Sequence, residues 1–170
     1  RRNFGGIRYL HEPTGFLVTG AIDDLWINGK EEYMVVDYKA TAKDEAVTVL
    51  DKEWQDGYKR QMEVYQWLLQ QNGFPVSHTG YFVYANGRRD KVAFDGKLEF
   101  DIKLIPYTGN TNWIEKTLGL IKHCLMDDRI PSASEECDYC AYRNQAGKAL
   151  LEATARLKEK TKDEPIKITK

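Results

Sequence analysis

Residues 16–41, FLVTGAIDDLWINGKEEYMVVDYKAT, decide the fold of this chain. Segments 16–27 and 33–41 are rich in branched and aromatic residues, which favours two β-strands. The polar run NGKEE between them favours a hairpin connection. Both segments are apolar on both faces, a pattern typical of a sheet that is covered on two sides.

The length of the hairpin loop decides which side chains face each other. A five-residue loop, 28–32, sets Asp23 opposite Asp37, with Cβ atoms about 4.5–5.5 Å apart. A two-residue turn at Asn28 would instead set Gly20 opposite Asp37. We expect the five-residue loop. Two carboxylates that close repel each other unless a cation lies between them, so this register indicates a metal site.

The rest of the chain alternates between helical and strand patterns. Its tail is charged, and we expect one domain over residues 1–157 followed by a flexible tail, 158–170. The expected elements are a helix at 53–71 that ends at Asn72-Gly73, a strand at 78–85, a turn at Asn86-Gly87, strands at 91–94 and 98–107, and helices at 112–126 and 141–158.

Composition excludes some classes of function. The chain has 170 residues, a net charge of −1 and a pI near 6.4, so it does not bind a partner through bulk positive charge. A local basic groove remains compatible with these values. No segment approaches the roughly 20 apolar residues that span a bilayer, and we expect no membrane association. Three cysteines do not form an even disulfide framework, which favours a cytoplasmic location.

Asp37 and Lys39 are two residues apart on a predicted strand, so their side chains point to the same side. Hard divalent cations prefer carboxylate and carbonyl oxygens, which Asp23, Asp37 and the backbone carbonyl of Tyr38 can supply. Lys39 could then orient or deprotonate an attacking water, or stabilise a charged transition state. An isolated Asp-x-Lys is more often an ion pair at a sheet edge, so the neighbouring motifs carry the argument.

Two further features bear on this site. Asp24 competes with Asp23 for the same role, and a one-residue slip of the strand would exchange them; we favour Asp23. Gln61 and Tyr65 are four residues apart, so they share one face of the predicted helix. An amide and a phenol near a metal are suited to contacts with phosphate or a base edge, although a partly buried tyrosine and a solvated glutamine also fit the pattern.

The order Gly-x-x-Asp (20–23), Val-Val-Asp-Tyr-Lys (35–39) and Gln-x-x-x-Tyr (61–65) resembles the PD-(D/E)XK nuclease superfamily. It is most similar to the RecB-type branch, which includes helicase-associated nucleases and the CRISPR adaptation nucleases. The resemblance covers about residues 15–143. It implies an α/β fold with a restriction-endonuclease-like core, in which a mixed β-sheet is flanked by helices.

The resemblance also implies roles. Asp23 and Asp37 would bind Mg²⁺ or Mn²⁺, Lys39 would be the catalytic lysine, and Gln61 and Tyr65 would position the substrate. The implied activity is metal-dependent hydrolysis of DNA phosphodiester bonds in DNA repair, recombination or defence, with a helicase or another nucleic-acid-processing protein as a partner. The alternative is a catalytically inactive nucleic-acid-binding or assembly module of the same fold.

Two departures from the RecB-type pattern stand out. The branch has an upstream His or Glu as a further metal ligand, and here only His11 and Glu12 are near, before the first predicted strand. Cys137 and Cys140 resemble part of a segment that binds an iron–sulfur cluster, but the set of four ligands is incomplete, so we expect no cluster. A structural zinc site formed by these two cysteines, Cys124 and a histidine is a further alternative.

Basic residues near these motifs predict a nucleic-acid face. Lys43 follows the second strand, and Lys59 and Arg60 adjoin the glutamine of the helix. A second cluster, Arg88, Arg89 and Lys91, is as compatible with solvated charges as with phosphate binding. Trp54 could belong to the core or stack on a base, and we expect the core.

Overall fold

The computed structural model describes residues 5–45, 47–90 and 96–162, with side chains described as far as residue 158. The chain forms two compact units, Arg1–Met126 and Asp127–Lys170, which are considered separately. The division expected from the sequence, a domain at 1–157 and a tail at 158–170, stays a prediction. No helix among the described residues has the length and apolar character needed to cross a membrane.

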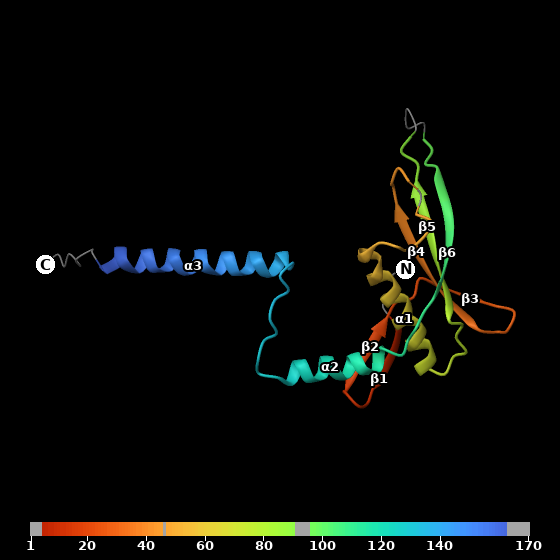
Figure 1. Cartoon of the computed structure of the whole chain (residues 1–170), viewed down its shortest axis with the longest axis horizontal. Coiled ribbons are helices and arrows are strands. Elements are labelled where there is room, and N and C mark those ends of the chain that lie inside the picture. Colours follow the sequence, from red (N-terminus) through yellow and green to blue (C-terminus); the bar gives the residue numbers. More distant parts are fainter. Residues whose placement is uncertain (1–4, 46, 91–95, 163–170) are drawn as a thin grey trace. The chain divides into compact units, whose positions relative to one another are not determined.

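The first unit is built on a four-stranded mixed sheet (Figure 1). Its strands follow in chain order: β3 (Asp24–Ile27), β4 (Tyr33–Thr41), β5 (Thr79–Gly87) and β6 (Phe100–Thr108). Strands β4 and β5 are parallel, whereas β3–β4 and β5–β6 are antiparallel pairs. A helix connects the two parallel strands, as parallel pairing requires. The predicted α/β architecture, a mixed sheet with helices, is confirmed.

A separate hairpin is formed by β1 (Ile7–His11) and β2 (Phe16–Gly20). The expected single strand at 16–27 is therefore wrong. The chain changes partner within it, since Gly20 pairs with Ile7 whereas Asp24 pairs with Val36. The three residues between these positions carry the chain from one sheet to the other. His11 also lies within a strand rather than before the first one.

Helix α1 (Asp56–Gln71) follows a short 3₁₀ helix, η1 (Glu53–Gln55), and together they match the predicted helix. The helix ends at Gln71 with Asn72 as its C-cap, and Gly73 has a φ of +82°, a value that favours glycine. Met62 and Leu69 of α1 pack on Val35 and Phe82 of the sheet. This contact forms the main core and fixes one face of the helix against β4 and β5.

Strand β5 is longer than predicted. Asn86 and Gly87 belong to the strand instead of forming a turn, and Gly87 pairs with Phe100 of β6. The extension is stabilised because the Asn86 side chain binds the backbone of the segment that follows β4. The strand predicted at 91–94, with Lys91, lies outside the described residues. The strand predicted at 98–107 is confirmed as β6.

Two helices follow the sheet. Helix α2 (Ile114–Met126) ends the first unit, and its Ile114 packs with Trp67 and Leu68 of α1. Helix α3 (Asp138–Lys162) belongs to the second unit and continues beyond residue 157, where the tail was expected to begin. Residues 163–170 lie outside the described residues.

The two faces of the sheet differ in their exposure to solvent. The face toward α1 is buried, and Val35 and Phe82 are fully inaccessible. Tyr38, Ile102 and Leu104 on the opposite face are 51%, 60% and 52% exposed. Burial on both faces, expected from the strand sequences, therefore applies only in part to the described residues.

Candidate active site

The register of the β3–β4 hairpin brings two carboxylates together. Ile27 pairs with Tyr33 and Asp24 with Val36, so the loop has five residues and the predicted register is confirmed. Side-chain and backbone oxygens of Asn28 accept hydrogen bonds within this loop, which closes it. Asp23, the residue before β3, lies beside β4, and its Oδ2 accepts the backbone N–H of Tyr38 at 3.0 Å.

Asp37 and Lys39 point to the same side of β4, as their spacing predicts. Asp37 is only 2% exposed, and its Oδ2 lies 2.5 Å from Lys39 Nζ. The same ammonium donates a hydrogen bond to Gln61 Oε1 at 3.3 Å. A buried ion pair is thus linked directly to a side chain of α1.

Burial raises the pKa of the Asp37 carboxyl above its ordinary value of 3.8. The hydrogen bond and charge of Lys39 oppose this shift, whereas the nearby charge of Asp23 adds to it. Repulsion from Asp23 means that the two carboxylates are close enough to interact. The hairpin register sets the two carboxylates opposite each other, so a cation between them would offset this repulsion.

Asp24 lies on the other side of the strand. It accepts hydrogen bonds from the Tyr38 hydroxyl at 2.8 Å, the Leu25 N–H at 2.8 Å and the Trp26 indole at 3.2 Å. The bond from Tyr38, followed by that from Leu25, holds the pKa of Asp24 below its ordinary value. The geometry therefore groups Asp23, rather than Asp24, with Asp37.

Gln61 and Tyr65 extend the cluster along α1. The Gln61 amide donates to the Tyr65 hydroxyl at 2.8 Å, so both face the same way. The Tyr65 ring lies against Gly20, where an added Cβ would be 2.8 Å from Cε1 of the ring. Glycine at position 20 is thus required for the tyrosine to reach its place.

Sequence reasoning missed Tyr58 as a member of this cluster. Lys39 Nζ lies 4.4 Å from the centre of the Tyr58 ring, a cation–π contact. The signal was present, because Tyr58 precedes Gln61 by three residues and Tyr65 by seven, which places all three on one helix face.

His11 lies in a different network. Its Nδ1 is 2.7 Å from Thr14 Oγ1 and its Nε2 is 2.6 Å from Glu115 Oε2. Trp67 donates to the same glutamate at 3.2 Å. His11 pairs with Phe16 at the turn of the hairpin, whereas Gly20 is at its open end. The structure therefore does not bring His11 together with Asp23 and Asp37, and it stays a predicted ligand only.

The donor chemistry of the cluster fits a hard divalent cation. Asp37 Oδ2 is buried, and its contact with a cationic group is the ion pair with Lys39. Asp23, Asp37 and the Tyr38 carbonyl provide oxygen donors of the type that Mg²⁺ and Mn²⁺ prefer. Among the described residues, there is no group of three or more His, Cys, Asp or Glu side chains that could hold a metal ion.

The predicted basic residues have different surroundings. Lys43 Nζ lies 4.6 Å from the centre of the Trp54 ring. Lys59 is paired with Asp56 at 2.8 Å, and Arg60 is exposed. Their role in nucleic-acid binding stays a prediction. Trp54 itself is 53% exposed, so its assignment to the core is wrong.

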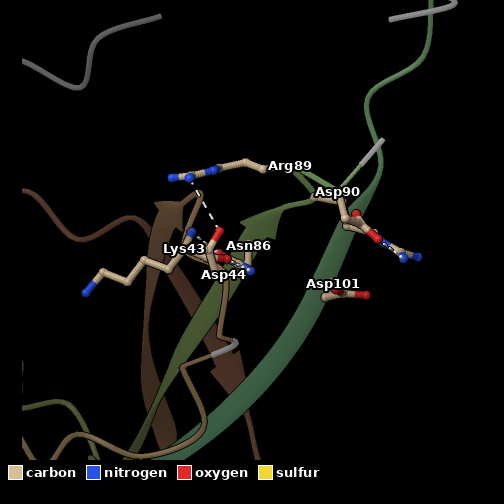
Figure 2. A pocket seen from close by; sticks show the side chains of 7 residues that line it. Lys43, Asp44, Asn86, Arg89, Asp90 and Asp101 are labelled. Atoms are coloured by element: carbon tan, nitrogen blue, oxygen red, sulfur yellow. Dashed lines mark hydrogen bonds and ion pairs between the residues drawn. The ribbon is translucent and has the colours of Figure 1, made fainter. Parts of the chain in front are cut away.

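The two described arginines of the second basic cluster have acidic neighbours. Arg88 pairs with Asp90 at 2.8 Å, and Arg89 lies 3.3 Å from Asp44. Figure 2 shows Arg89 reaching toward Asp44 across the pocket at the end of β4 and β5. These pairs favour solvated, compensated charges over a phosphate site at this position.

The three cysteines bear on the zinc alternative. Cys137 and Cys140 have their Sγ atoms 2.7 Å apart at the start of α3, and Cys124 is exposed in α2. Two thiols supply half of a four-ligand site. The zinc alternative therefore gains no support from the described residues.

The comparison with protein families agrees with this geometry. The model of the PD-(D/E)XK nuclease superfamily matches residues 2–145. The chain belongs to the PD-(D/E)XK nuclease superfamily. Members of this superfamily are usually nucleases and generally use Mg²⁺ or Mn²⁺. The searches of curated proteins and of solved structures gave no match.

Proposed function

We propose that this chain is a metal-dependent deoxyribonuclease of the RecB-type branch. The observation that carries the proposal is the buried Asp37–Lys39 pair, with Asp23 beside it and Gln61 in contact with the lysine. This arrangement places two carboxylates and an ammonium at one point of the sheet. We place the enzyme in DNA repair, recombination or defence, with a helicase or similar protein as a partner, on the strength of that resemblance alone.

Each side chain of the candidate site has a separate role in this proposal. Asp23 and Asp37 would hold Mg²⁺ or Mn²⁺, together with the backbone carbonyl of Tyr38. When bound, such a cation lowers the pKa of water and stabilises negative charge on phosphate. Lys39 directs its ammonium toward the attacked phosphate, where it orients the water and stabilises developing charge. Gln61 and Tyr65, linked by their hydrogen bond, position the substrate.

The test is cleavage of labelled single- and double-stranded DNA in Mg²⁺, Mn²⁺ or EDTA. We expect products from the wild type in either cation and none in EDTA. Asp37→Ala and Lys39→Ala should each lower the rate by at least about a hundredfold, since each removes a group that acts in the transition state. Cleavage that survives both substitutions contradicts the proposal.

Asp23→Asn and Asp24→Asn form a matched pair of neighbouring carboxylates. Only Asp23 lies beside Asp37, whereas Asp24 bonds to Tyr38 and Trp26 on the other face. We expect Asp23→Asn to abolish cleavage and Asp24→Asn to leave most of it. Equal losses would show that the effect comes from hairpin stability and not from the site.

A second candidate is a catalytically inactive nucleic-acid-binding module of the same fold. It is favoured by the small ligand set, because the described residues hold no group of three or more metal-binding side chains. Under this alternative, the wild type binds DNA in a binding assay but yields no cleavage products, even in Mn²⁺. Metal-dependent products that disappear in Lys39→Ala exclude it.

A further inference from the structure

Trp54 is an exposed aromatic residue near the candidate site. It lies in η1, directly before α1, and it is 53% exposed. Lys43 Nζ lies over its ring, 4.6 Å from the centre. An exposed indole beside an ammonium is the combination with which proteins stack a base and contact its phosphate.

A single aromatic ring separates Trp54 from the candidate catalytic lysine. Tyr58 packs edge-on against Trp54, with ring centres 5.6 Å apart. Its ring also receives the ammonium of Lys39, 4.4 Å from the centre. A base stacked on Trp54 would therefore belong to a nucleotide close in sequence to the phosphate held at Asp37 and Lys39.

The segment that carries Lys43 is held at both ends by buried amides. Asn86, 5% exposed, accepts the Lys43 N–H at 2.8 Å and donates to the Lys43 carbonyl at 2.9 Å. Gln55, 1% exposed, accepts the Lys52 N–H at 2.9 Å. Figure 2 shows the Lys43 side chain extending away from Asn86. The backbone of Lys43 is therefore anchored before any ligand binds, which lowers the cost of ordering this segment on binding.

A cleft of about 340 Å³ lies between this segment and Trp54, within the size range of ligand sites. Its lining is mixed in character: Val47 and Val49 are apolar, and Lys43, Lys52, Glu45 and Asp51 carry charges that balance. A balanced cleft does not attract phosphate through net charge. Recognition there depends on stacking and apolar contact, which suits the flat face of a base.

We propose that Trp54 and Lys43 bind an unpaired base of the DNA strand whose phosphate lies at Asp37 and Lys39. The enzyme therefore acts on single-stranded DNA or on a single-stranded end, because a base within a duplex is not free to stack on a side chain. This inference rests on the proposed function for the identity of the ligand.

The experiment measures binding without turnover. Fluorescein-labelled oligothymidine, the same oligomer with abasic residues, and a duplex are titrated with the full chain in EDTA and again in Ca²⁺. We expect the wild type to bind oligothymidine more tightly than the duplex. Trp54→Ala should weaken binding of oligothymidine by about 5-fold to 150-fold, the range for loss of one stacked base. Trp54→Phe should keep part of the affinity, since it keeps an aromatic face.

The abasic oligomer provides the decisive comparison because it has the same phosphates without bases. We expect it to bind the wild type weakly and to lose little further affinity in Trp54→Ala. Phe74→Ala is the matched control, since Phe74 is another partly exposed aromatic residue, 44% exposed, that contacts Tyr33 instead. The affinity of Phe74→Ala for oligothymidine should equal that of the wild type.

The outcomes separate the two proposals. Equal binding of the abasic and normal oligomers by the wild type overturns the stacking site, whatever happens to the variants. If Trp54→Ala binds oligothymidine as the wild type does while metal-dependent cleavage persists, only the stacking site is overturned. A wild type that neither binds nor cleaves any DNA overturns the proposed function as well.

Discussion

Gly20 lies where the chain leaves β2, and its lack of a side chain makes room for Tyr65. An alanine there would place Cβ 2.8 Å from Cε1 and 2.9 Å from Cδ1 of the ring, and 3.0 Å from Leu68 Cδ1. Because the ring must move, its hydrogen bond with Gln61 is strained or lost. We expect Gly20→Ala to lower the free energy of unfolding by about 1–3 kcal/mol and to reduce cleavage, measured by urea unfolding and DNA digestion.

Gly29 provides the control for this substitution. A Cβ added at Gly29, in the hairpin loop, meets no atom within 4 Å. Gly29→Ala should therefore leave cleavage unchanged and alter stability by no more than about 0.5 kcal/mol. If both alanine variants behave alike, the loss at Gly20 is not caused by contact with Tyr65.

The parts of the candidate site that depend on spacing within one strand or one helix were predictable from the sequence. Asp37 and Lys39 share a strand face, and Gln61 and Tyr65 share a helix face. The residue repeat of a strand or a helix is therefore enough to group each pair. The hairpin loop then brings Asp23 to Asp37. Trp54 was not predictable in this way, because helical spacing cannot distinguish a core position from an exposed one in the turn that precedes a helix.

Helix α1 is tied to the connection between β6 and α2 by a buried carboxylate. Glu63, 7% exposed, accepts hydrogen bonds from the Tyr107 hydroxyl at 2.7 Å, the Trp113 indole at 2.6 Å and the Asn110 N–H at 3.0 Å. Burial, together with the hydrogen bond to Glu63, raises the pKa of Tyr107, so this phenol stays protonated as a donor. The arrangement holds α1 in place beneath the candidate site.

Removing this carboxylate leaves three donors without their acceptor. We expect Glu63→Ala to lower the free energy of unfolding by about 3 kcal/mol or more, measured by urea denaturation. Glu53→Ala is the control, because Glu53 is exposed in η1, and its effect should not exceed about 0.5 kcal/mol. A loss at Glu63 no larger than the control would mean that the three donors find other partners.

Cys137 and Cys140, at the start of α3, allow a separate prediction about thiol reactivity. Hydrogen bonding with the Cys140 thiol, whose Sγ lies 2.7 Å away, lowers the pKa of Cys137 from its ordinary value of 9.0. The Cys140 N–H, which donates to Cys137 Sγ at 3.3 Å, adds to this shift. The thiolate of Cys137 therefore persists to lower pH than usual. In Cys140→Ala the contact between the two thiols is lost, so the midpoint of Cys137 alkylation by iodoacetamide should move to higher pH, as followed by mass spectrometry.

An unchanged midpoint in Cys140→Ala would show that the two thiols do not interact in solution. Alkylation of Cys124, which is exposed in α2, is followed in the same samples as an internal control. Its pH profile should be the same in the wild type and in Cys140→Ala, because Cys124 has no part in the contact between the other two thiols.

Elements were predictable where a segment stays within one sheet or one helix, and not where the chain passes from one sheet to another. Strand β4 matches its pattern because it stays within the four-stranded sheet along its whole length, where it pairs with β3 and β5. Helix α1 matches its pattern because its apolar face packs on the core of the sheet. The segment 16–27 reads as continuous, yet its two ends pair with β1 and with β4. Asn86-Gly87 has a turn composition, but bonding of the Asn86 amide to Lys43 keeps it extended. Both differences depend on contacts between distant segments, which local sequence does not encode.

All the residues of the candidate site lie in the first unit, whereas the family match continues to residue 145, past the boundary at Met126. Residues 127–137 form neither helix nor strand, and the Arg129 side chain in this connection is 88% exposed. The connection is thus open to trypsin. We expect brief digestion to cut after Arg129 and to release a fragment that keeps its metal-dependent cleavage, measured on the purified fragment with labelled DNA.

Arg129→Gln should slow that cut without changing the activity of the intact chain, because it removes the tryptic site and no group of the candidate site. A fragment that still unfolds cooperatively but no longer cleaves DNA would mean that residues beyond 129 contribute to catalysis or substrate binding. A fragment that does not fold would mean that the second unit stabilises the first. Either result would extend the functional nuclease toward residue 145, because the family match continues there while the groups expected to perform the chemistry end at Tyr65.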